Sequence, residues 1–180
     1  MHRASLLALL DSHTPFDEIE AQMQGRFRRF VAAQPQCFER ALLEGHVTGS
    51  AWVLDSEGTH VLLLHHRKLD RWLQPGGHCD GDADVLRVAM REASEESGLL
   101  RLTPVSTAIF DVDVHPIPPR GEVPGHFHYD ARFLLRAAPG EAIRHNHESK
   151  DARWMPIEEA AQLHEASLRR MAQKVLASAF

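Results

Sequence analysis

Apolar residues in the first part of the chain recur at helical spacing. A short apolar run covers residues 6–10, and a longer pattern over residues 16–33 has apolar side chains at Phe16, Ile19, Met23, Phe27 and Phe30. Residues three and four positions apart lie on one face of a helix, so both segments are predicted to be helical. Pro35 ends the second pattern, because proline cannot continue a helix. We therefore expect a helical N-terminal extension over residues 1–40.

From His46 the pattern changes to short apolar runs of β type that are separated by turn residues. These runs occupy residues 47–54, 60–65, 105–114, 127–135 and 151–155. Helical spacing returns over residues 83–97 and from Pro156 towards Ala179. A glycine-rich loop at residues 75–81 and a proline-rich loop at residues 116–124 connect these elements. Because strands and helices are interleaved, we predict an α/β domain with a mixed β-sheet over residues 41–180.

Composition and charge narrow the class of protein. Hydrophobic residues make up 43% of the chain and charged residues 25%, which is typical of a folded globular domain and not of a disordered one. The net charge of −5 gives no electrostatic basis for binding a nucleic-acid backbone. The two cysteines, Cys37 and Cys79, cannot build a disulfide framework and do not have zinc-ligand spacing.

The apolar run near the N-terminus bears on localisation. Asp11 closes this run, and no cleavage site of small residues follows, so we interpret it as the start of a helix and not as a secretion signal. No apolar run in the sequence is long enough to cross a bilayer. We expect a cytoplasmic protein with neither a membrane nor a nucleic acid as partner.

Three glutamates crowd one side of the predicted helix at residues 83–97. Glu92, Glu95 and Glu96 stand at positions i, i+3 and i+4. The repulsion between Glu92 and Glu96 costs about 0.2–0.5 kcal/mol when both are exposed. A hard divalent cation such as Mg²⁺ removes this repulsion, because it binds oxygen ligands. We expect Arg91 to reach Glu95 and to leave the other two carboxylates free; a solvated acidic face is the alternative interpretation.

The ends of this helix have recognisable capping residues. Asp82 is expected to accept hydrogen bonds from the free amides of the first turn. Gly98 stands where a left-handed residue commonly ends a helix. Between them, an apolar stripe is predicted to pack on a sheet, formed by Leu86, Ala89, Met90 and Ala93.

Several positions of this segment stand at a fixed spacing, namely Gly77, Arg91, Glu92, Glu95, Glu96, Gly98 and Leu99. In this register, with Ala93 in an aliphatic position, residues 77–99 resemble the motif of the Nudix hydrolase family (MutT-like). The resemblance implies a Nudix-type α/β/α sandwich with a mixed sheet, to which the N-terminal helices are an addition. It also implies a Mg²⁺-dependent enzyme, with Mn²⁺ as an alternative cofactor.

The family resemblance implies both a reaction and the roles of residues. Nudix hydrolases cleave a phosphoanhydride bond in a nucleoside diphosphate linked to another group, and a metal-activated water is the nucleophile. By resemblance, Glu92 and Glu96 are the principal metal ligands, with Glu95 close by. The Gly77 carbonyl is a further candidate ligand, and Arg91 belongs to the catalytic motif. The expected substrate is a small nucleotide-type diphosphate.

A later loop supplies a further catalytic candidate. Many family members take an additional glutamate from such a loop as a base or as a ligand. Glu148, just before the last predicted strand, is the candidate in this chain. A polar loop residue without a catalytic role is the alternative interpretation.

One position departs from the family pattern. The motif has an early glutamate where this chain has Ala83, flanked by Asp82 and Asp84. In the family that glutamate mainly supports the motif arginine. We therefore expect Ala83 to alter the orientation of Arg91 without removing metal binding.

Basic and imidazole side chains near the motif are candidates for substrate binding. Arg67, Lys68 and Arg71 precede the glycine-rich loop and are candidates to bind phosphate, with ordinary surface charge as the alternative. Three histidines form a second group, with His78 inside the loop and the pair His126 and His128 on one strand face. Such side chains bind phosphate, accept a proton or bind transition metals, whereas scattered surface histidines are the simpler interpretation.

Two further functions remain open from the sequence. A Nudix-like domain that senses a nucleotide without cleaving it is compatible with Ala83, although the intact glutamates argue against it. A diphosphate isomerase of related fold is the other alternative, but the chain does not match the cysteine-containing pattern of that branch, and Cys79 alone is weak evidence for it. No signature in the sequence identifies the substrate. The N-terminal helices are candidates to cover the site or to form a homodimer contact.

Overall fold

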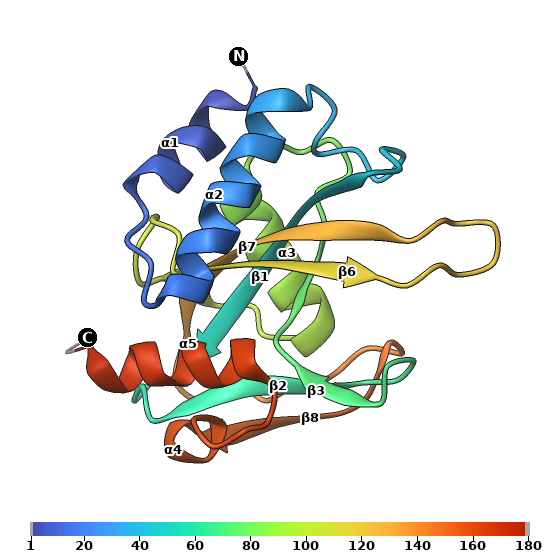
Figure 1. Cartoon of the computed structure of the whole chain (residues 1–180). Coiled ribbons are helices and arrows are strands. Elements are labelled where there is room, and N and C mark those ends of the chain that lie inside the picture. Colours follow the sequence, from blue (N-terminus) through green and yellow to red (C-terminus); the bar gives the residue numbers. More distant parts are fainter. Residues whose placement is uncertain (1, 179–180) are drawn as a thin grey trace.

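The fold is described here from a computed structural model, in which residues 2–178 are placed. Two helices begin the chain as predicted, α1 (Ala4–Ser12) and α2 (Glu18–Ala33). The Asp17 carboxylate caps α2 by accepting a hydrogen bond from the Glu20 amide at 2.7 Å. Figure 1 shows the two helices side by side, and Phe30 of α2 stacks on Tyr129 of the sheet with 3.8 Å between ring centroids. The helices therefore share a core with the sheet.

The centre of the sheet is a pair of parallel strands, β1 (Gly45–Leu54) and β7 (His126–Ala137). On the far side of β7, both β5 (Leu102–Pro104) and β6 (Asp111–Ile117) run antiparallel to it. The short strand β4 (Gly76–His78) runs antiparallel to β1. Parallel and antiparallel pairs thus occur in one sheet, which confirms the predicted mixed α/β architecture.

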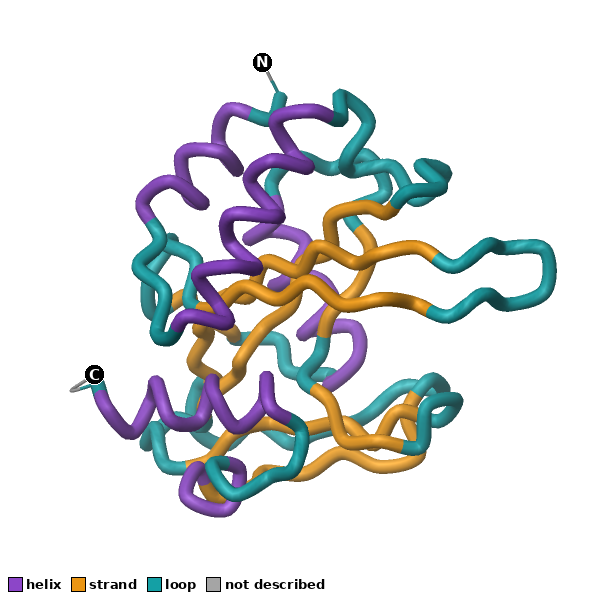
Figure 2. Tube along the Cα trace, viewed as in Figure 1, coloured by secondary structure: helices purple, strands orange, loops and turns teal. Residues whose placement is uncertain are grey.

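A second group of strands continues from the end of β1. It consists of β2 (His60–His66), β3 (Arg71–Leu73) and β8 (Ser149–Pro156), and both β3 and β8 pair antiparallel with β2. Figure 2 shows these strands below the β1–β7 pair, with the loop between β6 and β7 projecting from the body of the molecule.

Helices cover both faces of the strands. Helix α3 (Val85–Ser97) packs together with α1 and α2 in one core, whereas α4 (Ile157–Ala160) and α5 (Ala166–Ala177) pack in a second core. Side chains of β1 alternate between the two, since Ala51 and Val53 belong to the first core and Trp52 to the second. This layering is the predicted sandwich. None of the helices within residues 2–178 combines the length and apolar character that crossing a bilayer requires.

Two predicted elements are wrong in part. Residues 105–110 are not a strand, because the Ser106 hydroxyl accepts a hydrogen bond from the Ala108 amide at 3.1 Å and turns the chain there. The predicted final helix is broken after α4, and Glu165 caps a new helix by accepting from the Ser167 amide at 3.1 Å. Its predicted end at Ala179 lies outside the described residues. The domain boundary near residue 40 stays a prediction.

Candidate active site

Helix α3 has its caps at Asp84 and Gly98. The Asp84 carboxylate accepts a hydrogen bond from the Arg87 amide at 3.1 Å, so the predicted cap at Asp82 is wrong by two residues. Asp82 instead accepts from the Asp84 amide at 2.9 Å and from the Arg87 guanidinium, which shapes the preceding turn. Gly98 has the predicted left-handed backbone with φ of 72°.

The strand β4 places two glycine backbones against the glutamates of α3. The Gly76 amide donates to Glu96 Oε2 at 2.9 Å. A Cβ atom at Gly77 would lie 2.5 Å from the carboxyl carbon of Glu92, so a larger residue at this position would displace that carboxylate. The structure thus brings Gly77, Glu92 and Glu96 together, as the sequence predicts.

Glu96 is a buried carboxyl group that accepts a hydrogen bond from the Gly76 amide and forms no ion pair within residues 2–178. Burial raises the pKa of Glu96 to about 7, against the lowering effect of the Gly76 amide. The negative charges of Glu92, Glu148 and Glu95 raise the pKa of Glu96 further. Glu148 therefore lies close enough for its negative charge to act on Glu96. We call Glu92, Glu95, Glu96 and Glu148 together the carboxylate site.

Arg91 does not make the predicted pair with Glu95. Its guanidinium donates to Glu92 Oε1 at 2.7 Å and to the His78 carbonyl oxygen at 3.1 Å. The reason is tertiary, because the carbonyl of β4 offers an acceptor that an isolated helix lacks. Glu95 stays exposed. These two contacts orient Arg91 although Ala83 occupies the usual glutamate position.

The loop that contains Glu148 is held by Arg67. The Arg67 guanidinium donates to the carbonyl oxygens of His147 and Ser149, both at 3.0 Å, and its amide donates to the Glu148 carbonyl at 2.9 Å. The predicted phosphate-binding side chain thus fixes the backbone on both sides of Glu148. Lys68 is exposed in the turn between β2 and β3, and Arg71 is exposed at the start of β3.

Four histidine rings meet beside β4. The predicted His78, His126 and His128 are joined by His46 of β1, with ring centroids 4.8 Å apart for His46 and His128 and 4.9 Å for His46 and His78. His46 and His128 are register partners across the parallel pair. His46 was not predicted as a site residue, because the strand pattern around it does not show that β7 lies beside β1.

Burial keeps the inner histidines neutral. Burial, reinforced by neighbouring histidines, lowers the pKa of His46 to about 4 and that of His128 to about 2. His115 adjoins this group, with its ring 5.5 Å from that of His128, and its Nδ1 bonds to Asp113 at 2.8 Å.

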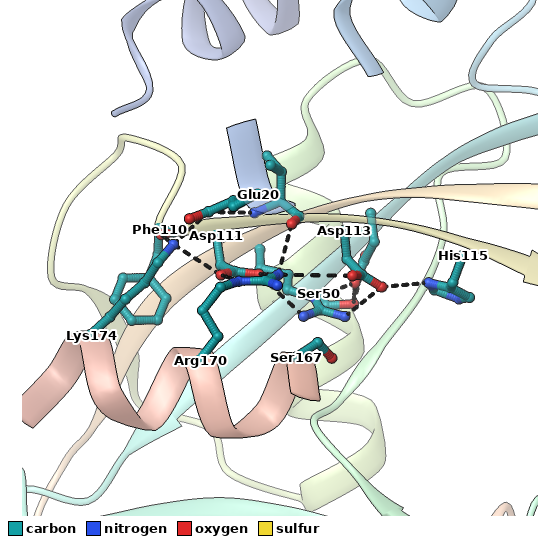
Figure 3. Close-up of polar contacts among 12 residues, drawn as sticks. Glu20, Ser50, Phe110, Asp111, Asp113, His115, Ser167, Arg170 and Lys174 are labelled. Atoms are coloured by element: carbon teal, nitrogen blue, oxygen red, sulfur yellow. Dashed lines mark hydrogen bonds and ion pairs between the residues drawn. The ribbon is translucent and has the colours of Figure 1, made fainter. Parts of the chain in front are cut away.

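A layer of buried charged side chains continues from the histidines under α5. Its members come from α2, β6, β7 and α5, and Figure 3 shows several of them converging on β6. We call this group the polar layer; it consists of Glu20, Asp111, Asp113, Asp130, Arg132, Arg170 and Lys174. The polar layer was not predicted from the sequence, in which its local signal is the alternation of charged and apolar residues in β6 and β7.

Each carboxylate of the polar layer has a cation. Asp111 accepts from Arg170 through both oxygens at 2.8 Å, and Arg132 lies 2.8 Å from Asp130 and 3.3 Å from Asp113. Burial would raise the pKa of Asp113, but Arg132 and neighbouring groups outweigh it and lower that pKa to about 2.

Glu20 connects the N-terminal helix to this layer. It accepts from Lys174, from the Phe16 amide at 2.7 Å and from the Val112 amide at 3.1 Å. Burial would raise the pKa of Glu20, but hydrogen bonds from His13, Lys174 and Phe16 lower it to about 2.

A cavity of about 950 Å³ lies between α1 and the start of α3. Leu9, Ala83 and Leu86 line it, but none of the predicted site residues does. We therefore place the candidate chemistry at the carboxylate site and not in this cavity.

Comparison with known proteins gives the family. The model of the NUDIX domain matches residues 45–175. A putative 8-oxo-dGTP diphosphatase 3 from Mycobacterium tuberculosis is 32% identical over 123 residues, which cover 59% of this chain and 49% of that protein. The chain thus spans about half the length of this curated relative.

Solved structures have the same fold. An Ap4A hydrolase from C. elegans is 20% identical with a TM-score of 0.59, covering 73% of this chain and 95% of that one. A NUDIX family hydrolase from Clostridium perfringens is 25% identical with a TM-score of 0.53, covering 73% of this chain and 97% of that one. The family model covers most of the chain and includes the β4–α3 segment with its glutamates. This chain belongs to the Nudix family.

Proposed function

We propose that the chain hydrolyses a phosphoanhydride bond in a nucleoside diphosphate linked to another group, with Mg²⁺ or Mn²⁺ as cofactor. The observation that carries the proposal is the unbalanced charge of the carboxylate site. The site contains four carboxylates. Within residues 2–178, Glu92 pairs with Arg91, and the other three carboxylates form no ion pair. A divalent cation balances such a site far better than a single arginine.

The donor set fits a hard cation. Glu92, Glu95, Glu96 and the Gly77 carbonyl would hold it, and all of these donors are oxygen atoms. When bound, the metal ion supplies charge neutralisation on the diphosphate and lowers the pKa of a coordinated water. The chain's own contribution is to fix the carboxylates, since the Gly76 amide holds Glu96 and Arg91 holds Glu92.

Glu148 is the proposed base that orients the attacking water. The negative charge of Glu148 raises the pKa of Glu96, which supports this role because it indicates that the two carboxylates lie near each other. Arg67 supports it indirectly by holding the backbone around Glu148. General-base assistance of this kind contributes about 10²–10⁴-fold to a rate.

Positive charge near the site is proposed to bind the substrate. Lys68 and Arg71 are exposed beside the Arg67–Glu148 contact and are free to reach a phosphate. His78, His126 and His128 are the proposed contacts on the β4 side, where His78 directly follows Gly77.

The curated relative and the solved structures suggest substrates to test. One is named for 8-oxo-dGTP and another for Ap4A, and both compounds contain the proposed phosphoanhydride linkage. A panel should therefore include 8-oxo-dGTP, Ap4A, ADP-ribose and a nucleotide sugar, each with Mg²⁺ and with Mn²⁺.

Release of the nucleotide product tests the proposal. We expect metal-dependent turnover of at least one panel member. Glu96→Gln should reduce this turnover by at least about 100-fold. Glu148→Gln should lower kcat with KM nearly unchanged. Glu158→Gln, at an exposed glutamate of α4, is the matched control and should behave like the wild type. Tight binding of one nucleotide without turnover would instead identify a sensor and contradict the hydrolase.

A further inference from the structure

Three imidazoles from three different strands converge beside the carboxylate site. His46 lies on β1, His78 on β4 and His128 on β7. One ring nitrogen from each lies within 4.8 Å of those of the other two. Three imidazoles at this distance are a ligand set that zinc-like ions prefer.

The nitrogens at the centre of this group have no protein partners. His46 is 3% exposed, and neither of its ring nitrogens makes a hydrogen bond within residues 2–178. The Leu42 carbonyl lies near the ring without hydrogen-bond geometry. Nε2 of His128 is also buried and unpartnered. A buried polar nitrogen without a partner destabilises the fold, and a bound ion would remove that cost.

The neighbouring histidines His115 and His126 are not among the rings whose nitrogens lie within 4.8 Å of one another. Nδ1 of His115 bonds to Asp113 at 2.8 Å, and Nδ1 of His126 bonds to the Pro124 carbonyl at 3.0 Å. The mutual distance of the ring nitrogens therefore separates His46, His78 and His128 from the two histidines beside them. Neutral imidazole is the form that binds a metal, and the burial of His46 and of Nε2 of His128 favours that form.

We propose that His46, His78 and His128 form a binding site for one divalent transition-metal ion of the zinc class, separate from the carboxylate site. Its nitrogen donors select Zn²⁺ or Co²⁺ over Mg²⁺, whereas the oxygen donors of the carboxylate site favour Mg²⁺. The two sites are therefore expected to prefer different ions. This inference holds whether or not the chain hydrolyses a diphosphate.

Small side-chain movements complete the site. Tetrahedral Zn–N bonds of about 2.0–2.1 Å place ligand nitrogens about 3.3 Å apart, so the rings must approach by at most about 1.5 Å. Three protein ligands leave a fourth position for water or for an oxygen of a bound molecule. Because the ligands come from β1, β4 and β7, the ion would tie β4 to the parallel pair at the centre of the sheet.

Binding of Co²⁺ and Zn²⁺ tests the proposal directly. The full chain, without a histidine tag, is treated with a chelator, dialysed, and titrated with Co²⁺ in excess Mg²⁺. We expect one equivalent to bind with the visible absorption bands of tetrahedral Co²⁺, and Zn²⁺ to displace it. Zn²⁺ should also raise the Tm, because it binds the folded state.

Variants assign the ligands. His78→Gln and His128→Gln should each weaken Co²⁺ binding by at least about 100-fold. His126→Gln in the same group, His60→Gln on β2 and Glu96→Gln at the carboxylate site should retain it. Circular dichroism of each variant verifies the fold, and the half-buried His78 provides the ligand change with the least effect on folding.

Two results would overturn the proposal. One is the absence of stoichiometric Co²⁺ binding by the folded wild-type chain. The other is binding that persists in folded His78→Gln and His128→Gln or that disappears in Glu96→Gln, because either pattern places the ion elsewhere.

Discussion

The carboxylate site and the polar layer each gather four carboxylates, but their charges are balanced differently. In the polar layer, Arg132, Arg170 and Lys174 contact the acids, and the pKa values of Glu20 and Asp113 fall to about 2. In the carboxylate site, Arg91 pairs with Glu92, and burial together with neighbouring acids raises the pKa of Glu96 to about 7.

This difference shows which acidic cluster needs an added cation. Carboxylates that already have arginine and lysine partners form a structural contact between α2, β6 and α5. In the carboxylate site the buried Glu96 has no cation partner among residues 2–178 and is repelled by its neighbours, so an added divalent cation would stabilise its anionic form. The same residue types thus have a structural role in one region and a proposed catalytic role in the other.

Removal of a cation from the polar layer is the largest expected effect. Arg132→Met leaves Asp111, Asp113 and Asp130 partly uncompensated in a buried position, so we expect a loss of about 3–5 kcal/mol in unfolding free energy. Urea denaturation measures it. Arg28→Gln, at an exposed pair with Asp11, is the control and should leave the midpoint nearly unchanged. An equally stable Arg132→Met would show that this layer is not balanced by its arginines.

The two regions should respond to pH with opposite signs. Glu20 and Asp113 have folded pKa values near 2, below their ordinary values of 4.5 and 3.8, so their stabilising effect is present above pH 4.5 and is lost as pH falls through about 2. Glu96 has a raised pKa of about 7, so its contribution is present below pH 4.5 and is lost as pH rises through about 7.

Denaturation of the metal-free protein over a pH series measures both signs. Glu96→Gln should gain stability relative to the wild type between about pH 5 and pH 8 in EDTA. Glu20→Gln should be less stable than the wild type near neutral pH, and this difference in unfolding free energy should disappear as the pH falls through about 2. Parallel curves for wild type and Glu96→Gln would contradict the raised pKa.

An added methyl group at Gly77 should disturb the carboxylate site alone. Its Cβ would meet the Glu92 carboxyl group, so Gly77→Ala should displace that side chain at a cost of about 1–3 kcal/mol and weaken Mn²⁺ binding. Gly25→Ala on α2 is the matched change, since Arg29 is the neighbour near its Cβ at 3.4 Å, and it should be neutral or stabilising. Unaltered Mn²⁺ binding in Gly77→Ala would argue that Glu92 is not a ligand.

Restoration of the family glutamate is the smallest expected effect. Arg91 is already oriented by Glu92 and the His78 carbonyl, so Ala83→Glu should change turnover and Mn²⁺ affinity by less than about 3-fold. Steady-state kinetics on the substrate identified in the panel measures it. A large gain would show that Ala83 limits this member of the family.

Helical spacing and the family motif together predicted that Gly77 and the helix glutamates lie near one another. Gly77, Glu92 and Glu96 lie within one strand–loop–helix segment, so their contact follows from helical periodicity and the family motif. The Arg91 pairing was predicted wrongly, because its acceptor is a carbonyl on β4 that the helix pattern does not show.

The polar layer could not be predicted from local patterns. Alternation in β6 and β7 indicates a polar face but not what covers it. The cover comes from distant segments, since Glu20 and Lys174 are 154 positions apart and meet only because α2 and α5 pack at the end of β6. His46 belongs to the same class, because its partner His128 is fixed by the parallel register.

Mn²⁺ binding measured by electron paramagnetic resonance is the most direct test that the carboxylate site is the one that needs a cation. Wild type, Glu96→Gln and the polar-layer variant Glu20→Gln are titrated at pH 8, with His128→Gln to separate the histidine site. We predict that Glu96→Gln weakens binding by at least about 10-fold, while folded Glu20→Gln and His128→Gln bind like the wild type. Equal Mn²⁺ affinity in Glu96→Gln and the wild type would contradict the account.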